Sequence, residues 1–252
     1  MLIAHISDTH VMRASSTDQI SRGREQSLRL CIQDINRQGV DVVLHTGDSV
    51  QNGLIEEYQF LQSIIDDLEA PLFIVPGNRD RLSAMRVGLK NLDYLTSKSE
   101  FLNYTIDNFS VRLIGMDSTL AGERKGFFCQ ARQDWLEKQL KLVPEKPTLI
   151  FFHHPPFDIP AEGYIQGYKC LEQRDALEDL ISRHDQVVQI LCGHVHSFNS
   201  KEWGRAKVTT MPSLAIDVRK SVDDIYSEAP IYLLHQLGPE KVLSTKLRIV
   251  PD

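Results

Sequence analysis

Short apolar runs alternate with helical patterns over the first 75 residues, and this alternation limits the folds open to the chain. The apolar runs are residues 2–6, 42–45 and 72–75. The helical patterns between them cover residues 21–38, which Gly39 ends, and 56–68. The order strand, helix, strand, helix, strand predicts a parallel sheet with right-handed crossovers.

The rest of the chain adds a hairpin, two more helices and several short strands. The predicted elements are a hairpin or meander of residues 102–106 and 111–116, helices at 130–142 and 171–182, and buried strands at 148–152 and 187–192. After residue 198 we expect short strands and no long helix. The prediction is therefore one domain over residues 1–252, of α/β class, with two packed sheets and helices outside.

Charge and composition exclude some classes of function. The formal net charge is −6, with no basic run, which argues against binding of long nucleic acid. No segment approaches the ~18 apolar residues of a membrane span, and the first ten residues lack the pattern of a signal peptide. The four cysteines form no CxxC motif, so we expect reduced thiols and a cytoplasmic protein.

Polar residues follow five of the predicted strands at the point where each strand ends. Small residues come first, and then Asp, Asn or His. Open α/β sheets bind ligands at the carboxyl ends of their strands, so parallel neighbouring strands would bring all five clusters to one rim. The candidate ligands are Asp8, His10, Asp48, Asn78, His153, His194 and His196.

These side chains have the donor chemistry of a transition-metal site. Carboxylate, carboxamide and imidazole without thiolate suit Mn²⁺, Fe, Zn²⁺ or Co²⁺ rather than Ca²⁺. Seven ligands are too many for one ion and fit two, with one carboxylate bridging and positions left for water and substrate. Each cluster alone would be interpreted as structural, but five in register favour a site. The other histidines, His5, His45, His184 and His235, are interpreted as structural, with His5 and His45 as alternative partners of the ligands.

Five short motifs resemble, in order, those of the calcineurin-like metallophosphoesterases. They are "DTH" at 8–10, "GD" at 47–48, "GNRD" at 77–80, "HH" at 153–154 and "GHVH" at 193–196. Longer stretches such as "GDSVQNGLIEEYQFL" and "FFHHPPF" resemble the bacterial class III cyclic-nucleotide phosphodiesterases and related glycerophosphodiesterases. The resemblance implies an α/β sandwich of two mixed β-sheets flanked by helices, with the metal site at the C-terminal ends of strands.

The resemblance also implies how the ligands are shared between two divalent ions, with Mn, Fe or Zn expected. Asp8, His10 and His196 would hold one ion, Asn78, His153 and His194 the other, and Asp48 would bridge them. His153 is preferred to His154 because the family's ligand directly follows the strand and stands two places before a proline. His154 would then support a ligand or face the substrate.

The implied reaction is hydrolysis of a small phosphodiester, either a cyclic nucleotide or a glycerophosphodiester. Hydroxide held by the two metals would attack phosphorus in line with the leaving oxygen. The residues predicted to be catalytic are Asp48, Asn78, Arg79 and His154. The alternatives are a phosphomonoesterase or nucleotide pyrophosphatase with the same metals, and a weak or inactive scaffold.

Arg79 departs from the family's usual motif, and this departure is the reason for considering an inactive scaffold. The family usually has His at this place, where it contacts the phosphate and assists departure of the leaving group. Arg cannot act as the acid, because its pKa lies above about 12, but it can donate to phosphoryl oxygens. The proton would then come from His154, a metal-bound water or solvent, or the leaving group would need none. The other interpretation is that Arg79 only pairs with a nearby carboxylate such as Asp80.

The substrate contacts and the oligomeric state have weaker signals. The predicted substrate-binding residues are Arg79, His154, Tyr164 and Tyr168. The two tyrosines lie in a loop that follows a predicted ligand, and they would stack on a base or pack the loop onto the body. The presence of only one motif-adjacent cation, Arg79, favours diesters. The C-terminal strands, such as residues 231–235, are candidates for a homodimer contact.

Overall fold

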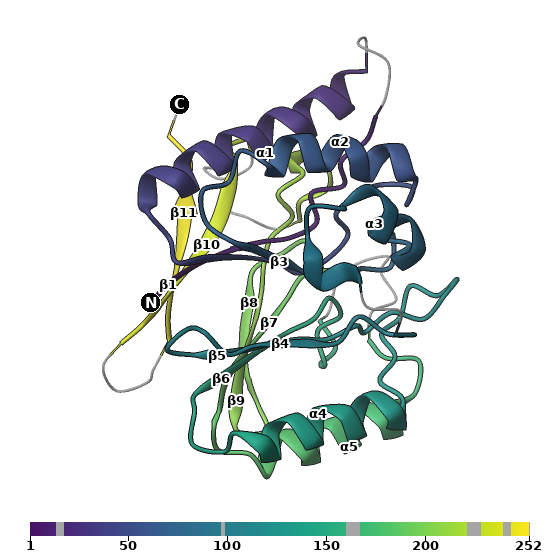
Figure 1. Cartoon of the computed structure of the whole chain (residues 1–252), viewed down its shortest axis with the longest axis vertical. Helices are drawn as coiled ribbons and strands as arrows, with labels where there is room; N and C mark the ends of the chain where they lie inside the picture. The colour runs from purple at the N-terminus through teal and green to yellow at the C-terminus, as the bar shows by residue number, and fades with distance from the viewer. Residues whose placement is uncertain (14–17, 97–98, 160–166, 221–227, 239–242, 252) are drawn as a thin grey trace.

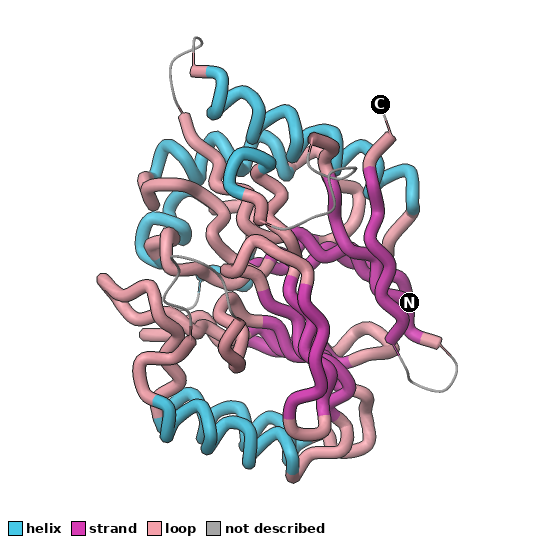
Figure 2. Tube along the Cα trace, turned by 180° about the vertical axis from the view of Figure 1, so that it is seen from behind, coloured by secondary structure: helices cyan, strands magenta, loops and turns pink. Residues whose placement is uncertain are grey.

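The chain forms two stacked β-sheets with helices on both outer faces (Figures 1 and 2). The computed structural model describes residues 1–13, 18–96, 99–159, 167–220, 228–238 and 243–251. In Figure 1, α1 and α2 lie along the top and α4 and α5 along the bottom, with both sheets between them. Each sheet contains parallel and antiparallel pairs, so the predicted sandwich of two mixed sheets is confirmed.

The first sheet has the strand order β11-β10-β1-β2-β3. Its strands are β1 (Leu2–Ile6), β2 (Val42–His45), β3 (Leu72–Ile74), β10 (Ile231–Leu237) and β11 (Leu243–Ile249). The first three strands are parallel neighbours, as the alternation of strand and helix predicted. The C-terminal hairpin β10-β11 continues the sheet, with β10 antiparallel to β1.

The second sheet has the strand order β4-β5-β6-β7-β9-β8. Its strands are β4 (Tyr104–Ile106), β5 (Arg112–Gly115), β6 (Thr148–Phe151), β7 (Val187–Cys192), β8 (Asn199–Trp203) and β9 (Ala206–Thr210). The strands β5, β6, β7 and β9 are parallel, and an antiparallel strand stands at each edge. The five strands with polar ends therefore belong to two sheets rather than one, with β1 to β3 in the first and β6 and β7 in the second.

The helices follow the predicted amphipathic segments. They are α1 (Gln19–Gln38), α2 (Ile55–Ile65), α3 (Leu82–Gly88), α4 (Gln130–Leu142) and α5 (Leu171–Ser182). The Asp18 side chain caps α1 by accepting from the N–H groups of Ile20 and Ser21. The helix predicted to reach residue 68 ends at Ile65, and α3 was not predicted. No helix in the described part of the chain combines the length and the apolar character that crossing a bilayer requires.

Three apolar layers hold the sandwich together, and the two-residue period of the strands assigns side chains to them. Ile3, Leu44 and Leu149 belong to the layer in which side chains of the two sheets meet. Their strand neighbours Ala4 and Ile150 point the other way, into the layers packed under the outer helices. All of these side chains are fully buried. This packing fixes the strand ends relative to one another.

Close contact between α2 and α3 positions the loop after β3. A Cβ atom on Gly88 of α3 would overlap the Cβ of Tyr58 in α2. The Tyr58 hydroxyl donates to Asp80 Oδ1 at 2.9 Å and accepts from the Arg81 N–H at 2.9 Å. The helix pair therefore holds the "GNRDR" segment through one tyrosine.

We expect Gly88→Ala to lower the free energy of unfolding by about 1–3 kcal/mol, because the added methyl forces α2 and α3 apart. Gly23→Ala is the matched control, since a Cβ at Gly23 in α1 meets nothing within 4 Å. That change should raise the free energy of unfolding by about 0.5–1 kcal/mol, because alanine favours a helix interior. Urea denaturation measures both, and equal stability of the two variants would contradict the predicted packing.

Candidate metal centre

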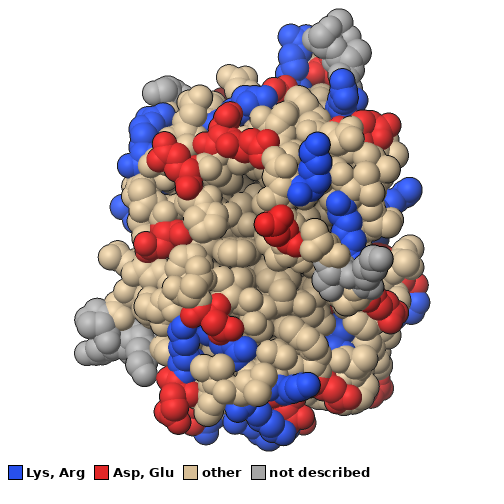
Figure 3. Space-filling model, in the orientation of Figure 1, with Lys and Arg blue, Asp and Glu red and all other residues tan. Residues whose placement is uncertain are grey.

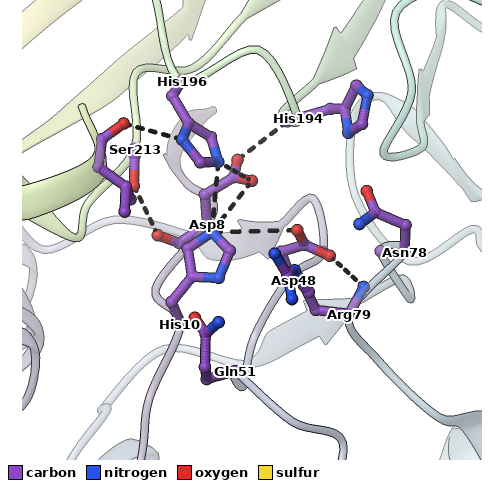
Figure 4. Close-up of polar contacts among 12 residues, drawn as sticks. Asp8, His10, Asp48, Gln51, Asn78, Arg79, His194, His196 and Ser213 are labelled. Carbon is purple, nitrogen blue, oxygen red and sulfur yellow. Dashed lines mark hydrogen bonds and ion pairs between the residues drawn. The ribbon is translucent and has the colours of Figure 1, made fainter. Parts of the chain in front are cut away.

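Asp8, His10 and His196 converge at the ends of β1 and β7 (Figure 4). The Nε2 atoms of His10 and His196 are 3.3 Å apart. Asp8 Oδ1 lies 3.8 Å from His10 Nε2 and 3.2 Å from His196 Nε2. Two atoms bound to one ion at about 2.1 Å each lie at most about 4.2 Å apart, so these distances suit ligands of a shared ion.

A second group of donors meets at the ends of β3, β6 and β7. The Nε2 atom of His153 is 3.3 Å from Asn78 Oδ1 and 3.2 Å from His194 Nδ1. His153 and His194 are fully or almost fully buried, whereas Asn78 is partly exposed. The seven candidate ligands therefore come together in two groups, although their strands belong to different sheets.

Asp48, at the end of β2, lies between the two groups. Its Oδ2 is 3.9 Å from His10 Nε2, and its Oδ1 is 3.5 Å from His153 Nε2. The Arg79 backbone N–H donates to the same Oδ1 at 2.7 Å, which fixes the rotation of the carboxylate. One oxygen faces each group, an arrangement in which a carboxylate can bridge two ions.

The backbone is strained at the ligand positions. Among the residues that the structure describes, five other than glycine have positive φ, and all five are candidate ligands: Asp8 (52°), His10 (45°), Asp48 (50°), His194 (72°) and His196 (57°). This left-handed region is uncommon for residues with a Cβ, and such strain of about 1–3 kcal/mol per residue concentrates at functional sites. The surrounding structure holds these side chains in place against a local energetic preference.

Several ligands use one side-chain atom in a hydrogen bond with the surrounding protein, and this leaves their other polar atom facing the site. Asp8 Oδ2 accepts from Ser7 Oγ at 2.6 Å and from the His194 N–H at 3.0 Å, whereas Asp8 Oδ1 is buried and accepts no hydrogen bond. The Nδ1 atoms of His153 and His196 lie 2.7 and 2.9 Å from the carbonyl oxygens of Thr46 and Val218. When each Nδ1–H donates a hydrogen bond to its carbonyl, the Nε2 atom carries no proton. Its lone pair is then available to a metal ion.

Burial controls ionisation in the site. It raises the pKa of Asp48 to about 7 and lowers the pKa of His10 to about 3. Burial also opposes ionisation of Asp8, but the nearby imidazoles of His196, His153 and His10 together outweigh it and hold the pKa of Asp8 below its ordinary range. A cation between these groups would favour the ionised carboxylates and replace the proton on imidazole nitrogen. The Asp8 oxygen without a hydrogen bond, the buried imidazoles and the strained backbone all fit two metal ions.

A buried arginine that the sequence did not reveal ties several ligand-bearing segments together. Arg24 in α1 makes a bidentate pair with Asp217, with Nε–Oδ1 at 2.9 Å and Nη2–Oδ2 at 2.6 Å. Its Nη1 donates to the carbonyl of His10 at 3.0 Å and to Gln51 Oε1 at 2.9 Å. Asp217 precedes Val218, whose carbonyl orients His196. One guanidinium thus braces both histidines of the first group.

A cavity of about 920 Å³ is lined by Asn78 and Arg79, and Asn78 is the one candidate ligand among its described lining residues. Arg79 is exposed and forms no ion pair with any residue in the described part of the chain. Asp80 instead accepts from Ser49 Oγ at 2.6 Å, from the Gly77 N–H at 2.9 Å and from Tyr58. The structure therefore does not contain the Arg79–Asp80 pair considered above.

Two other predicted substrate contacts are buried. His154 is 1 % exposed, its Nδ1 lies 2.9 Å from Ser118 Oγ, and it does not line the cavity. Tyr168 is 3 % exposed, and its hydroxyl donates to the carbonyl of His154 at 3.0 Å. This placement favours packing for Tyr168 and support of neighbouring ligands for His154 over substrate contact. Tyr164 lies outside the described residues.

Two mixed sheets with a buried cluster of Asp and His at their strand ends define a metallophosphatase fold. The family described as "Calcineurin-like phosphoesterase" matches residues 1–198. The chain belongs to this family of metallophosphoesterases, as the five motifs indicated.

Three similar proteins show how this chain relates to others. "Probable glycerophosphodiester phosphodiesterase GpdQ" of Arcobacter nitrofigilis is 32% identical over 97% of this chain and 92% of its own length. "3',5'-cyclic adenosine monophosphate phosphodiesterase CpdA" of Escherichia coli K12 is 24% identical over 99% and 90% of the two chains. A crystal structure of a dimetal phosphatase from Danio rerio has a TM-score of 0.74 at 13% identity, covering 100% of this chain and 96% of that one, which shows the shared fold.

We expect Arg24→Met to weaken metal binding at the His10–His196 group by about 10- to 100-fold, because removing the brace frees the segments that orient both histidines. Asp217→Asn should act in the same direction. Calorimetric titration with Mn²⁺, together with metal analysis after dialysis, measures affinity and stoichiometry.

Arg248→Met provides the control for this prediction. Arg248 makes a similar bidentate pair with Asp34, at 2.7 and 2.8 Å, but touches none of the candidate ligands. It should change stability and leave metal affinity unaltered. Equal metal affinity in the Arg24 and Arg248 variants would show that Arg24 contributes only to stability.

Proposed function

We propose that this chain hydrolyses small phosphodiesters, of glycerophosphodiester or cyclic-nucleotide type, with two divalent ions. In this proposal Asp8, His10 and His196 hold one ion, and Asn78, His153 and His194 hold the other. Asp48 bridges them. The observation that supports the proposal most directly is the position of Asp48, with one carboxylate oxygen 3.9 Å from His10 and the other 3.5 Å from His153.

When bound, the two ions supply Lewis-acid stabilisation of phosphate charge and a hydroxide nucleophile at neutral pH. Four positive charges then stand against the two carboxylates of Asp8 and Asp48, so the site attracts an anion although the chain carries a net charge of −6. On the face shown in Figure 3, acidic and basic residues are interspersed. That distribution supports local capture of a small anionic substrate rather than binding of a long polyanion.

Arg79 serves in this proposal as a donor to the phosphoryl group. Its backbone holds Asp48, and its exposed side chain lines the cavity beside Asn78. A guanidinium there stabilises charge developing on phosphoryl oxygens but cannot protonate the leaving group. Since His154 is buried against His153 and His194 and does not line the cavity, solvent in the open cavity is the proposed source of that proton.

The substrate class is inferred from the relatives and from the size of the cavity. Two similar proteins are named as phosphodiesterases, one for glycerophosphodiesters and one for cyclic AMP. A cavity of about 920 Å³ accommodates the alcohol groups that a diester carries on both sides of phosphorus. A phosphomonoesterase or pyrophosphatase with the same ions, and an inactive scaffold, are the alternatives that experiment must separate.

We expect protein stripped with EDTA to be inactive, and Mn²⁺ to restore turnover of bis-p-nitrophenyl phosphate well above that of p-nitrophenyl phosphate. Asp48→Asn removes the negative bridging oxygen, so it should abolish turnover and lower the amount of bound metal from two ions toward one. Absorbance of p-nitrophenolate and metal analysis give the two readouts. Preferential turnover of the monoester would instead establish a phosphomonoesterase, and two bound ions without any turnover would establish a scaffold.

Arg79→His tests whether the missing acid limits the rate. General acid catalysis is worth about 10²–10⁴-fold, so we expect at least tenfold faster release of an alkyl alcohol, with a smaller effect on p-nitrophenolate, which leaves without a proton. Arg79→Gln is the control, because it removes the guanidinium without adding an acid, and it should slow both substrates. A loss of activity in Arg79→His on both substrates would show that the guanidinium itself carries the role.

A further inference from the structure

A second arginine, Arg81, faces the same cavity as Arg79, so the prediction of a single motif-adjacent cation was wrong. Both are exposed and both line the space next to Asn78. In the described part of the chain, the Arg81 side chain makes no ion pair and no hydrogen bond. Two unpaired guanidinium groups separated by one residue therefore stand at one side of the candidate site.

The stem of Arg81 rests against a glycine. A Cβ atom on Gly53 would lie 2.7 Å from Arg81 Cγ and 3.1 Å from its Cδ, so only glycine leaves room for this path. Gly53 also has a φ of +67°, a conformation that residues with a Cβ rarely adopt. The Arg81 backbone N–H is held by the Tyr58 hydroxyl at 2.9 Å. The side chain is thus placed by the fold, with its guanidinium left for a ligand.

The other charged residues around the cavity are mostly engaged with each other or with the backbone. Arg132 donates to the carbonyl oxygens of Phe127 and Thr119, and lies 3.7 Å from Asp117. Asp117 also accepts from the Thr119 N–H at 2.8 Å, and Asp80 is bonded as described above. Glu100 is the remaining carboxylate of the lining, and it is solvent-exposed. Among the described lining residues three arginines stand against three carboxylates, so the positive charge available to a ligand lies in the two guanidinium groups that pair with none of those carboxylates, Arg79 and Arg81.

In the proposed function, two metal ions and Arg79 already surround the scissile phosphate, so that phosphate does not require a second arginine. We propose that Arg81 forms a subsite for a second anionic group of the substrate, beside the scissile phosphate that Arg79 contacts in the proposed function. The preferred diesters then carry a further phosphate or carboxylate on one of their two alcohol groups. This inference rests on the proposed phosphodiesterase function and specifies its substrate class.

A matched pair of chromogenic diesters tests the subsite. The two substrates are thymidine 5′-(p-nitrophenyl phosphate) and the same compound bearing a 3′-phosphate, assayed with Mn²⁺-loaded protein. We expect kcat/KM to be about tenfold higher for the 3′-phosphorylated substrate, the size of one charge-assisted contact. Arg81→Gln should remove this preference and change kcat/KM for the substrate without the 3′-phosphate by less than about twofold. Arg81→Lys should keep part of it.

Two glycine variants distinguish the effect of moving the Arg81 side chain from the effect of disturbing the cavity in general. Gly53→Ala should displace the arginine stem and reduce the preference as Arg81→Gln does. Because its Cβ would also lie 3.0 Å from the Arg79 carbonyl oxygen, turnover of both substrates should fall as well. Gly122→Ala is the control, since Gly122 also lines the cavity at positive φ, but a Cβ there meets nothing within 4 Å. It should retain the preference. Loss of the preference in both variants alike would remove the support that the Gly53 contact gives to the inference.

The outcomes distinguish this inference from the proposed function. Hydrolysis of both substrates at equal kcat/KM, with no effect of Arg81→Gln, would overturn the subsite and leave the phosphodiesterase standing. Hydrolysis of neither would overturn the proposed function. In that case calorimetric binding of thymidine 3′,5′-bisphosphate and thymidine 5′-monophosphate still tests Arg81. About tenfold tighter binding of the bisphosphate, lost in Arg81→Gln, supports the subsite, and equal affinities overturn it.

Discussion

Two carboxylates buried together with a cluster of imidazoles impose the main physical constraint on this molecule. Asp8 and Asp48 are each at most 3 % exposed, and a buried carboxylate is costly to ionise unless cations or donors compensate it. Backbone N–H groups compensate part of the cost, through His194 for one carboxylate and Arg79 for the other. The remaining oxygens face imidazole nitrogen. Divalent cations at these places would turn a destabilising arrangement into a stabilising one, so folding and metal binding should be coupled.

The sandwich can hold this cluster of buried ligands in place because both sheets contribute the strands that carry them. Strands β1 to β3 and strands β6 and β7 end at the same region, and the apolar layer between the sheets keeps those ends in register. The ligands then occupy short loops in which five non-glycine residues adopt positive φ. Strain of this kind persists only where many surrounding contacts determine the backbone. Packing far from the site therefore determines how accurately the donors meet, and the Arg24–Asp217 pair provides the last constraint on two of them.

Local patterns predicted the strands and the ligands, whereas long-range contacts could not be predicted from them. The apolar runs of β1 and β2 and the polar residues at their ends are adjacent in sequence, so a short window contains the whole signal. Arg24 and Asp217 are separated by 193 positions, and nothing near either residue indicates the other. Tyr168 lies in a loop whose docking depends on distant partners, so its sequence left stacking and packing equally open. The helix α3 was missed because seven residues carry too little periodicity.

The two arginines of the "GNRDR" segment are best understood from what the segment lacks. A histidine at position 79 would add a general acid, but a large fraction of its imidazole would be neutral near pH 7. A guanidinium stays positively charged at that pH. Exchange of an acid for a permanent cation favours binding of anionic groups over protonation of a leaving group. A second permanent cation at Arg81, seated on Gly53, extends the same preference further along the cavity. The carboxylate of Asp80, between them, accepts hydrogen bonds from Ser49 and Tyr58 and therefore points into the protein. The two guanidinium groups of the segment point outward, toward the cavity. The departure from the family motif is therefore consistent with a change in substrate preference rather than with simple loss of catalysis.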